Sequence, residues 1–270
     1  MKKMIVFGTG EAICLHYTNT AFALYNGEEY FLTDGTGGPD IIRCFKAANI
    51  DWSKLHYAFL SHEHTDHLLG MVWALRNVAE YMTYGGYDDG RFTIFTHDVA
   101  AEKLKAICKM LLKPLLYDKV ENRMDFVLVE DGQQVEVMGD TFTFFDIQSK
   151  KAKQFGYRLD SKDGHSIVFL GDEPFNEHCA KYMENCQWLL TEAFCLQAEE
   201  HIYNPKQLFH STVRDSSLTA ERFHVENLVL WHTEDRSTYG RRKELYTAEA
   251  REYYSGNVFV PDDMETIDLW

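Results

Sequence analysis

The stretch Ser61-His62-Glu63-His64-Thr65-Asp66-His67 constrains what this chain can fold into more than any other part of the sequence. It follows an apolar run, His56–Leu60, that predicts a strand. It precedes a helical apolar spacing that runs from His67 to about Tyr81. Core histidines each need a polar partner, and clustered imidazoles repel one another when protonated, so a purely structural role would be costly. The stretch therefore indicates a metal site between a strand and a helix.

The spacing of these residues suggests how they would be used. In an extended or turn conformation His62 and His64 point to the same side, whereas Asp66 and His67 enter the helix. The first pair can then serve one metal ion and the second pair a neighbouring one. The alternative is a polar surface turn with accidental histidines, and the HxHxDH pattern favours metal.

The remaining segments repeat one order in both halves of the chain: strands, then helices, then strands. The predicted strands are Met4–Phe7, Asn19–Tyr25, Glu28–Thr33, His56–Leu60, Phe92–Phe95, Phe126–Val129, Gln134–Met138, Thr141–Ile147, Phe155–Leu159, Ser166–Leu170, Trp188–Thr191, Leu228–Trp231 and two short terminal strands. The predicted helices are Asp40–Ala48, residues 67 to about 81, Asp98–Leu112, Pro174–Glu184, Thr212–Phe223 and Thr247–Tyr254. The three strands between residues 126 and 147 read as a meander. Two sheets packed face to face with helices outside fit this order.

Charge and composition limit the classes of function that this chain could have. Lys and Arg number 27 against 42 Asp and Glu, a net charge of −15, which argues against non-specific nucleic-acid binding. The basic runs Lys150-Lys151-Ala152-Lys153 and Arg241-Arg242-Lys243 are candidates for a local basic patch, although such runs are more often solvated surface. The six cysteines form no CxxC and read as reduced thiols. No apolar run is long enough for a membrane span, and a cytoplasmic location is expected.

Beyond the histidine motif, further segments resemble the metallo-β-lactamase-fold hydrolases, and most closely their ribonuclease Z-like branch. They are Phe7-Gly8-Thr9-Gly10, Asn19-Thr20, Leu32-Thr33-Asp34-Gly35, Phe155-Gly156-Tyr157-Arg158, Gly171-Asp172, Thr191-Glu192-Ala193, His210-Ser211-Thr212 and Leu228-Val229-Leu230-Trp231-His232. Thr191 stands where the branch usually has histidine. The resemblance covers nearly the whole chain. It implies an α/β fold, an αββα sandwich of two packed mixed sheets with helices on the outer faces, as a single domain over residues 1–270.

The resemblance also implies roles for the matching residues. The implied metal ligands are His62, His64, Asp66, His67, Asp172 and His232, with Asp172 as the bridging carboxylate. Asp66 and His210 are the implied catalytic residues: Asp66 would orient the attacking water or take its proton, and His210 would stabilise developing charge or protonate the leaving oxygen. Asp34 and Glu192 would support ligand side chains. Taken alone, Asp34 could be an ordinary turn residue, Asp172 a helix cap and His232 a strand-end histidine.

Two departures from the family pattern affect these expectations. The branch usually has another histidine shortly before Phe155, but none lies between His97 and His165. Gln148 stands near that position as a tentative ligand, although it also reads as a polar strand-end residue facing solvent. An amide oxygen binds zinc more weakly than imidazole, so the His62/His64 site is expected to be the weaker of two. The second departure is the stretch 159–170, a plain hairpin where tRNA-processing members carry a long basic arm.

These observations predict a metal-dependent hydrolase with two divalent metal ions, zinc first and manganese or iron as alternatives. A metal-activated water would cleave a phosphodiester or similar ester in a small or short substrate. The alternatives are a ribonuclease Z-type tRNA 3′ endonuclease, and a metal-bearing binding or sensor protein with weakened catalysis. No membrane partner is expected, and the sequence is compatible with a homodimer.

Overall fold

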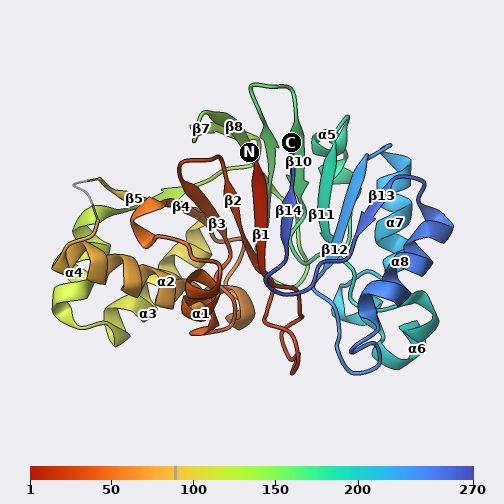
Figure 1. Cartoon of the computed structure of the whole chain (residues 1–270), viewed down its shortest axis with the longest axis horizontal. Coiled ribbons are helices and arrows are strands. Elements are labelled where there is room, and N and C mark those ends of the chain that lie inside the picture. The colour runs from red at the N-terminus through yellow and green to blue at the C-terminus, as the bar shows by residue number, and fades with distance from the viewer. Residues whose placement is uncertain (88–89) are drawn as a thin grey trace. The chain divides into compact units, whose positions relative to one another are not determined.

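The strand β1 (Lys3–Gly8) pairs antiparallel with β14 (Thr266–Asp268), so segments far apart in the sequence share one sheet (Figure 1). This computed structural model describes residues 1–87 and 90–270. Its contacts separate the chain into unit 1, with residues 1–8, 18–129 and 263–270, and unit 2, with residues 9–17 and 130–262. The single domain expected from the sequence stays a prediction.

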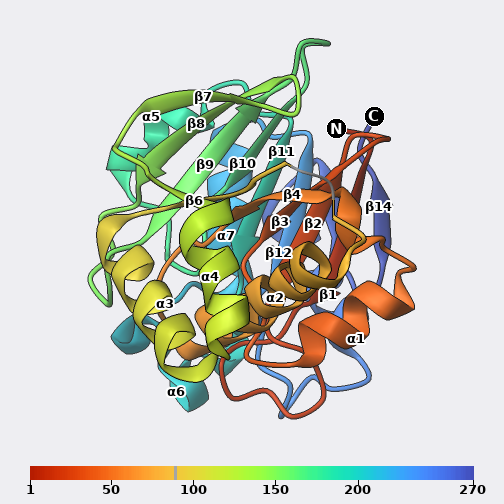
Figure 2. The ribbon, with the colours of Figure 1, turned by 90° about the vertical axis from the view of Figure 1, so that its left-hand side faces the viewer.

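Unit 1 is built on a mixed sheet in the order β14-β1-β2-β3-β4-β5-β6. Strands β14 to β3 pair antiparallel and β3 to β6 pair parallel. Its remaining strands are β2 (Ala21–Tyr25), β3 (Tyr30–Thr33), β4 (Leu55–Phe59), β5 (Phe92–Thr96) and β6 (Met124–Leu128). Its helices are α1 (Asp40–Ala47), α2 (Thr65–Tyr84), α3 (Asp98–Leu111) and α4 (Pro114–Arg123), with a 3₁₀ turn at Trp52–Lys54. The helices lie along one face of the sheet (Figure 2), where apolar side chains of both layers form one core.

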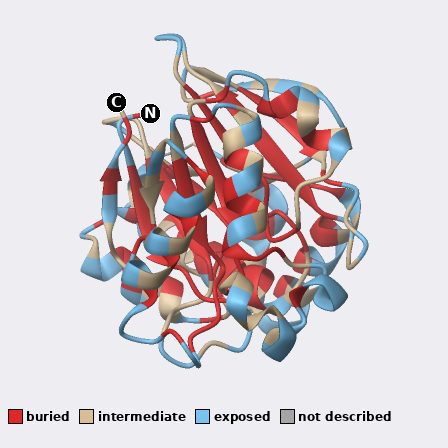
Figure 3. Cartoon of the chain, turned by 90° about the vertical axis from the view of Figure 1, so that its right-hand side faces the viewer, coloured by how far each residue is buried: buried red, intermediate tan, exposed pale blue. Residues whose placement is uncertain are grey.

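Unit 2 repeats this construction with the strand order β13-β12-β11-β10-β9-β8-β7. Strands β7 to β10 pair antiparallel and β10 to β13 pair parallel. The strands are β7 (Gln133–Val137), β8 (Asp140–Asp146), β9 (Phe155–Asp160), β10 (Ser166–Phe169), β11 (Trp188–Glu192), β12 (Asn227–Trp231) and β13 (Asn257–Phe259). The helices are α5 (Ala180–Met183), α6 (Glu200–Tyr203), α7 (Val213–Arg222) and α8 (Arg242–Tyr253), with 3₁₀ turns at Glu177–Cys179, Gln197–Glu199 and Pro205–Leu208. Figure 3 shows the helices of unit 2, which are exposed on their outer faces and cover buried strands.

Some predictions about the elements need correction, and one helix was missed. The strands between residues 126 and 147 are no meander, because β6 pairs parallel with β5 in one sheet while β7 pairs with β8 in the other. Helix α4 (Pro114–Arg123) was not predicted. The helix predicted over Pro174–Glu184 is reduced to a 3₁₀ turn and α5, because the Asn176 side chain accepts a hydrogen bond from the backbone of His178 and delays the start. In the described part of the chain, no helix is both long and apolar enough to cross a membrane.

The turn after β3 touches helix α2 backbone to backbone. The Gly35 amide donates to the His67 carbonyl (2.9 Å), and the Gly70 amide donates to the Thr36 carbonyl (2.8 Å). A Cβ atom on Gly70 would lie 1.5 Å from the Gly35 oxygen, and one on Gly35 would lie 2.0 Å from the Met71 nitrogen. Only glycine fits at these two positions, and their contact fixes the end of β3 against the first turns of α2.

We therefore expect Gly70→Ala to lower the free energy of unfolding by about 1–3 kcal/mol or more, because the added methyl group forces the turn and the helix apart. Gly38→Ala is the matched control, since a Cβ there has nothing within 4 Å. Urea denaturation of both variants measures the effect. Equal stability of the two would show that the backbone contact does not constrain α2.

Candidate metal centre

The Asp34 carboxylate lies behind the histidine motif of unit 1. Asp34 follows β3 and is buried, with only 1% of its surface exposed. Its oxygens accept hydrogen bonds from the Ser61 amide (2.8 Å), the Ser61 hydroxyl (2.8 Å) and Nδ1 of His67 (2.7 Å). The Ser61 hydroxyl also lies 3.0 Å from Nδ1 of His62. Asp34 and Ser61 thus bind the Nδ1 atoms of two imidazoles. Metal-binding histidines are commonly oriented in this way, with the other ring nitrogen left as the metal ligand.

The side chains of His62, His64, Asp66 and His67, here called the histidine cluster, lie together. His62 and His64 belong to the segment between β4 and α2, and the other two belong to the first turn of α2. The ring centroid of His62 lies 4.5 Å from that of His64 and 4.3 Å from that of His67. Oδ2 of Asp66 is 3.2 Å from Nε2 of His67. Glu63 does not join them: it binds the Lys103 ammonium at 2.8 Å.

The protonation of His67 reflects this environment. Burial lowers the pKa of His67, but the carboxylates of Asp66 and Asp34 outweigh burial and raise the pKa well above its usual value. The imidazolium is therefore favoured while only protein groups surround it. A metal ion bound at Nε2 would displace this proton and provide the positive charge that the two carboxylates favour.

Unit 2 contains a second group, here called the aspartate cluster, made of Asp172, His210 and His232. Asp172 follows β10 and His232 follows β12, both at the carboxyl ends of parallel strands. Each residue offers one ligand atom within 4.8 Å of the others, and Oδ2 of Asp172 lies 3.5 Å from Nε2 of His232. His232 has a left-handed backbone with φ of 53°, which is uncommon outside glycine. The chain thus holds an unfavourable backbone conformation where it presents this imidazole.

His210 is held from behind by Glu192. Nδ1 of His210 lies 3.5 Å from the fully buried Glu192 carboxylate, and its ring stacks on Phe194 at 4.9 Å. Burial lowers the pKa of His210, but the contact with the Glu192 carboxylate raises the pKa by more than burial lowers it, so the net shift is upward. Glu192 also accepts a hydrogen bond from the Ser211 amide, which anchors the segment after His210. Glu192 therefore contacts a predicted catalytic residue of unit 2.

Sequence reasoning missed two residues that contact Asp172. The Gln154 amide donates to its Oδ1, and the Lys151 ammonium lies 3.4 Å from its Oδ2. Lys151 belongs to a basic run read as solvated surface, yet only 15% of its side chain is exposed. The tentative ligand Gln148 is exposed instead, and its backbone N–H donates a hydrogen bond to the Asp146 carboxylate. The sequence of this basic run alone does not reveal which of its lysines points into the protein.

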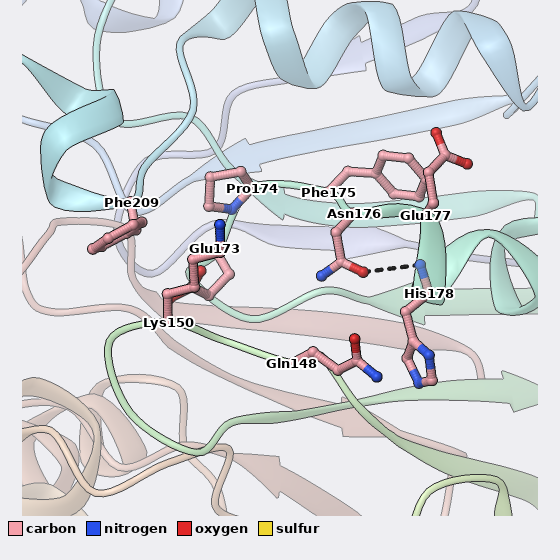
Figure 4. Close-up of a pocket in the computed structure, with 9 residues that line it drawn as sticks. All are labelled: Gln148, Lys150, Glu173, Pro174, Phe175, Asn176, Glu177, His178 and Phe209. Carbon is pink, nitrogen blue, oxygen red and sulfur yellow. Dashed lines mark hydrogen bonds between the residues drawn. The ribbon is translucent and has the colours of Figure 1, made fainter.

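Two cavities open beside the aspartate cluster. The first, of about 440 Å³, is lined by Gln148, Lys150, Glu173, Pro174, Phe175, Asn176, Glu177, His178 and Phe209 (Figure 4). The second, of about 400 Å³, shares Pro174, Phe175 and Phe209 with it and adds His210 and Lys206. Both volumes suit a small ligand. The shared aromatic residues and the two lysines offer apolar and cationic contacts within reach of one candidate catalytic residue.

Comparison with known proteins gives consistent results. The sequence model of the family described as the beta-lactamase superfamily domain matches residues 38–233. The ribonuclease Z of Thermococcus sibiricus is 24% identical, over 100% of this chain and 97% of that protein. The metallo-β-lactamase fold protein YhfI of Bacillus subtilis superposes with a TM-score of 0.79 at 16% identity, over 98% of both chains. A diphosphatase of the PhnP family gives 0.74 at 15%, over 100% of this chain and 98% of the other. The predicted fold class is confirmed by these likenesses.

We expect Asp34→Ala to weaken zinc binding by about 10–100-fold, because His67 and Ser61 lose the acceptor that orients them. Asp40→Ala is the control, since Asp40 pairs with exposed Arg43 at the start of α1. Competition with a chromophoric chelator measures both affinities. Unchanged affinity in Asp34→Ala would separate Asp34 from the metal site.

Proposed function

The chain belongs to the beta-lactamase superfamily domain family, and on that premise we propose that it hydrolyses a phosphodiester in a small or short substrate. It is a metal-dependent hydrolase with the metallo-β-lactamase fold and is similar to ribonuclease Z, as the sequence predicted. The observation that carries the proposal is the histidine cluster, with its Nδ1 edges held by Asp34 and Ser61.

We propose that six side chains supply the metal ligands: His62, His64, Asp66, His67, Asp172 and His232. Imidazole and carboxylate donors suit zinc, and iron or manganese is the alternative. Two findings support the set. Both clusters lie within residues 38–233 of the family match. His62, Asp172 and His232 each follow the end of a strand. A bound divalent ion would lower the pKa of a water molecule and so provide the nucleophile.

The chain's own residues would guide the remaining steps. Asp66, in the first turn of α2, would accept a hydrogen bond from the attacking water and orient it. His210, held by Glu192, would donate a proton to the leaving oxygen or stabilise its charge. Lys150 and Lys206, which line the two cavities, would attract the phosphate group.

The size of the substrate is inferred from charge and shape. A net charge of −15 disfavours a tRNA-sized polyanion, and β9 and β10 form a short hairpin through residues 161–165, as predicted. The cavities accommodate a small ligand, and the diphosphatase likeness is compatible with one. A tRNA 3′ endonuclease is the second candidate, because the similarity to ribonuclease Z spans the whole chain. The homodimer and the cytoplasmic location stay predictions.

The test compares substrates on zinc-loaded protein. Hydrolysis of bis-p-nitrophenyl phosphate without cleavage of a precursor tRNA is the expected result. Cleavage of the precursor tRNA at its 3′ side would favour the second candidate. Zinc binding without turnover of either substrate would favour a binding or sensor protein.

We expect His210→Ala to lower kcat for bis-p-nitrophenyl phosphate by about 100-fold or more, because general acid catalysis by histidine contributes that much. Its zinc content should stay near that of the unaltered protein. His201→Ala, on the exposed face of α6, is the control and should retain activity. Loss of zinc in His210→Ala would make His210 a metal ligand, which the 4.8 Å spacing of the aspartate cluster permits.

A further inference from the structure

Lys151 carries a positive charge into the aspartate cluster. It lies in the segment between β8 and β9, and its ammonium donates a hydrogen bond to the Asp172 carbonyl (2.9 Å). The same nitrogen is 3.4 Å from Oδ2 of Asp172, 3.7 Å from the Glu173 carboxylate and 3.4 Å from Nε2 of His210. This lysine is therefore surrounded by groups that could otherwise face a metal ion or a substrate.

The loop around Lys151 is built to hold it there. The Ser149 hydroxyl accepts hydrogen bonds from the amides of Lys151 (3.1 Å) and Ala152 (3.3 Å), and it donates one to Glu173 (2.6 Å). Its neighbour Lys150 is exposed and lines the first cavity. The inward position of Lys151 is thus a fixed feature of this turn, in contrast to the solvated lysine beside it.

The contacts of Asp172 leave limited room for two metal ions. A carboxylate offers about four lone-pair positions on its two oxygens. On Asp172, Oδ1 accepts the Gln154 amide, while Oδ2 lies near both Lys151 and Nε2 of His232. A carboxylate that bridges two metal ions must contact a cation on each side. Here one of those two cations is already supplied by the protein.

We propose, on the premise of the metal centre proposed above, that the Lys151 ammonium takes the place of one of the two metal ions at Asp172. The chain then binds one divalent ion tightly and the second only weakly. This accounts for the absence of histidine between His97 and His165 in the sequence, because an ammonium needs no imidazole ligand. Lys151 also contributes a hydrogen-bond donor next to His210, where an anionic oxygen of a phosphodiester could bind.

The test counts zinc ions rather than turnover. Metal-free protein is equilibrated with zinc and analysed by elemental analysis and by competition with a chromophoric chelator. We expect one tightly bound zinc ion per unaltered chain. In Lys151→Met, which keeps an aliphatic stem but loses the charge, the second zinc ion should bind at least about 10-fold more tightly. Lys151→Ala should behave in the same way, and thermal unfolding verifies that each variant is folded.

Two controls separate charge from a general disturbance of the loop. Lys151→Arg keeps the cation and should bind a single tight zinc ion. Lys150→Ala removes the exposed neighbour, and its zinc stoichiometry and affinity should match those of the unaltered protein. Two tight zinc ions in the unaltered chain, or unchanged binding in Lys151→Met, would overturn the inference and leave the proposed function standing. Absence of zinc binding in every variant would overturn both.

Discussion

The buried carboxylate of Asp34 is the group on which the candidate site of unit 1 depends. It joins the end of β3 to the segment after β4 through Ser61, and to the first turn of α2 through His67. Asp34 itself has a left-handed backbone with φ of 57°, which costs roughly 1–2 kcal/mol for a residue with a side chain. The closely packed Gly35 and Gly70 hold the adjoining turn in place. The strained backbone of Asp34 and the close packing that only glycine allows at Gly35 and Gly70 thus help to position the imidazoles.

Much of the fold followed from the sequence because apolar periodicity and turn residues act locally. The strands predicted over Asn19–Tyr25 and Glu28–Thr33 contain β2 and β3, and the spacing after His67 correctly predicted most of α2. Pairing between strands is not local, so the apolar runs between residues 126 and 147 could not show that β6 and β7 join different sheets. Helix α4 was not predicted because only two of its positions, Leu116 and Val120, are buried, and the charged residues among them hide the apolar periodicity.

The candidate site was predictable where its residues stand close together in the sequence, as in the histidine cluster. Its supporting residues were harder to find, because a lysine or glutamine reaches a site only through the course of its loop. Lys151 and Arg242 both sit in basic runs that read as solvated surface. Arg242 is in fact 1% exposed and donates to Thr9 and to the Pro261 carbonyl. Composition counts such charges correctly but cannot say which of them reach the solvent.

The pairing of β1 with β14 has a consequence for synthesis on the ribosome. Residues 130–262 of unit 2 are all translated after β1 and before β14 (Thr266–Asp268). Throughout that interval the sheet of unit 1 ends at β1, whose outward amides and carbonyls remain open to other chains. A nascent chain in this state is vulnerable to edge-to-edge aggregation. Pairing with β14 closes this edge once the last strand has been translated.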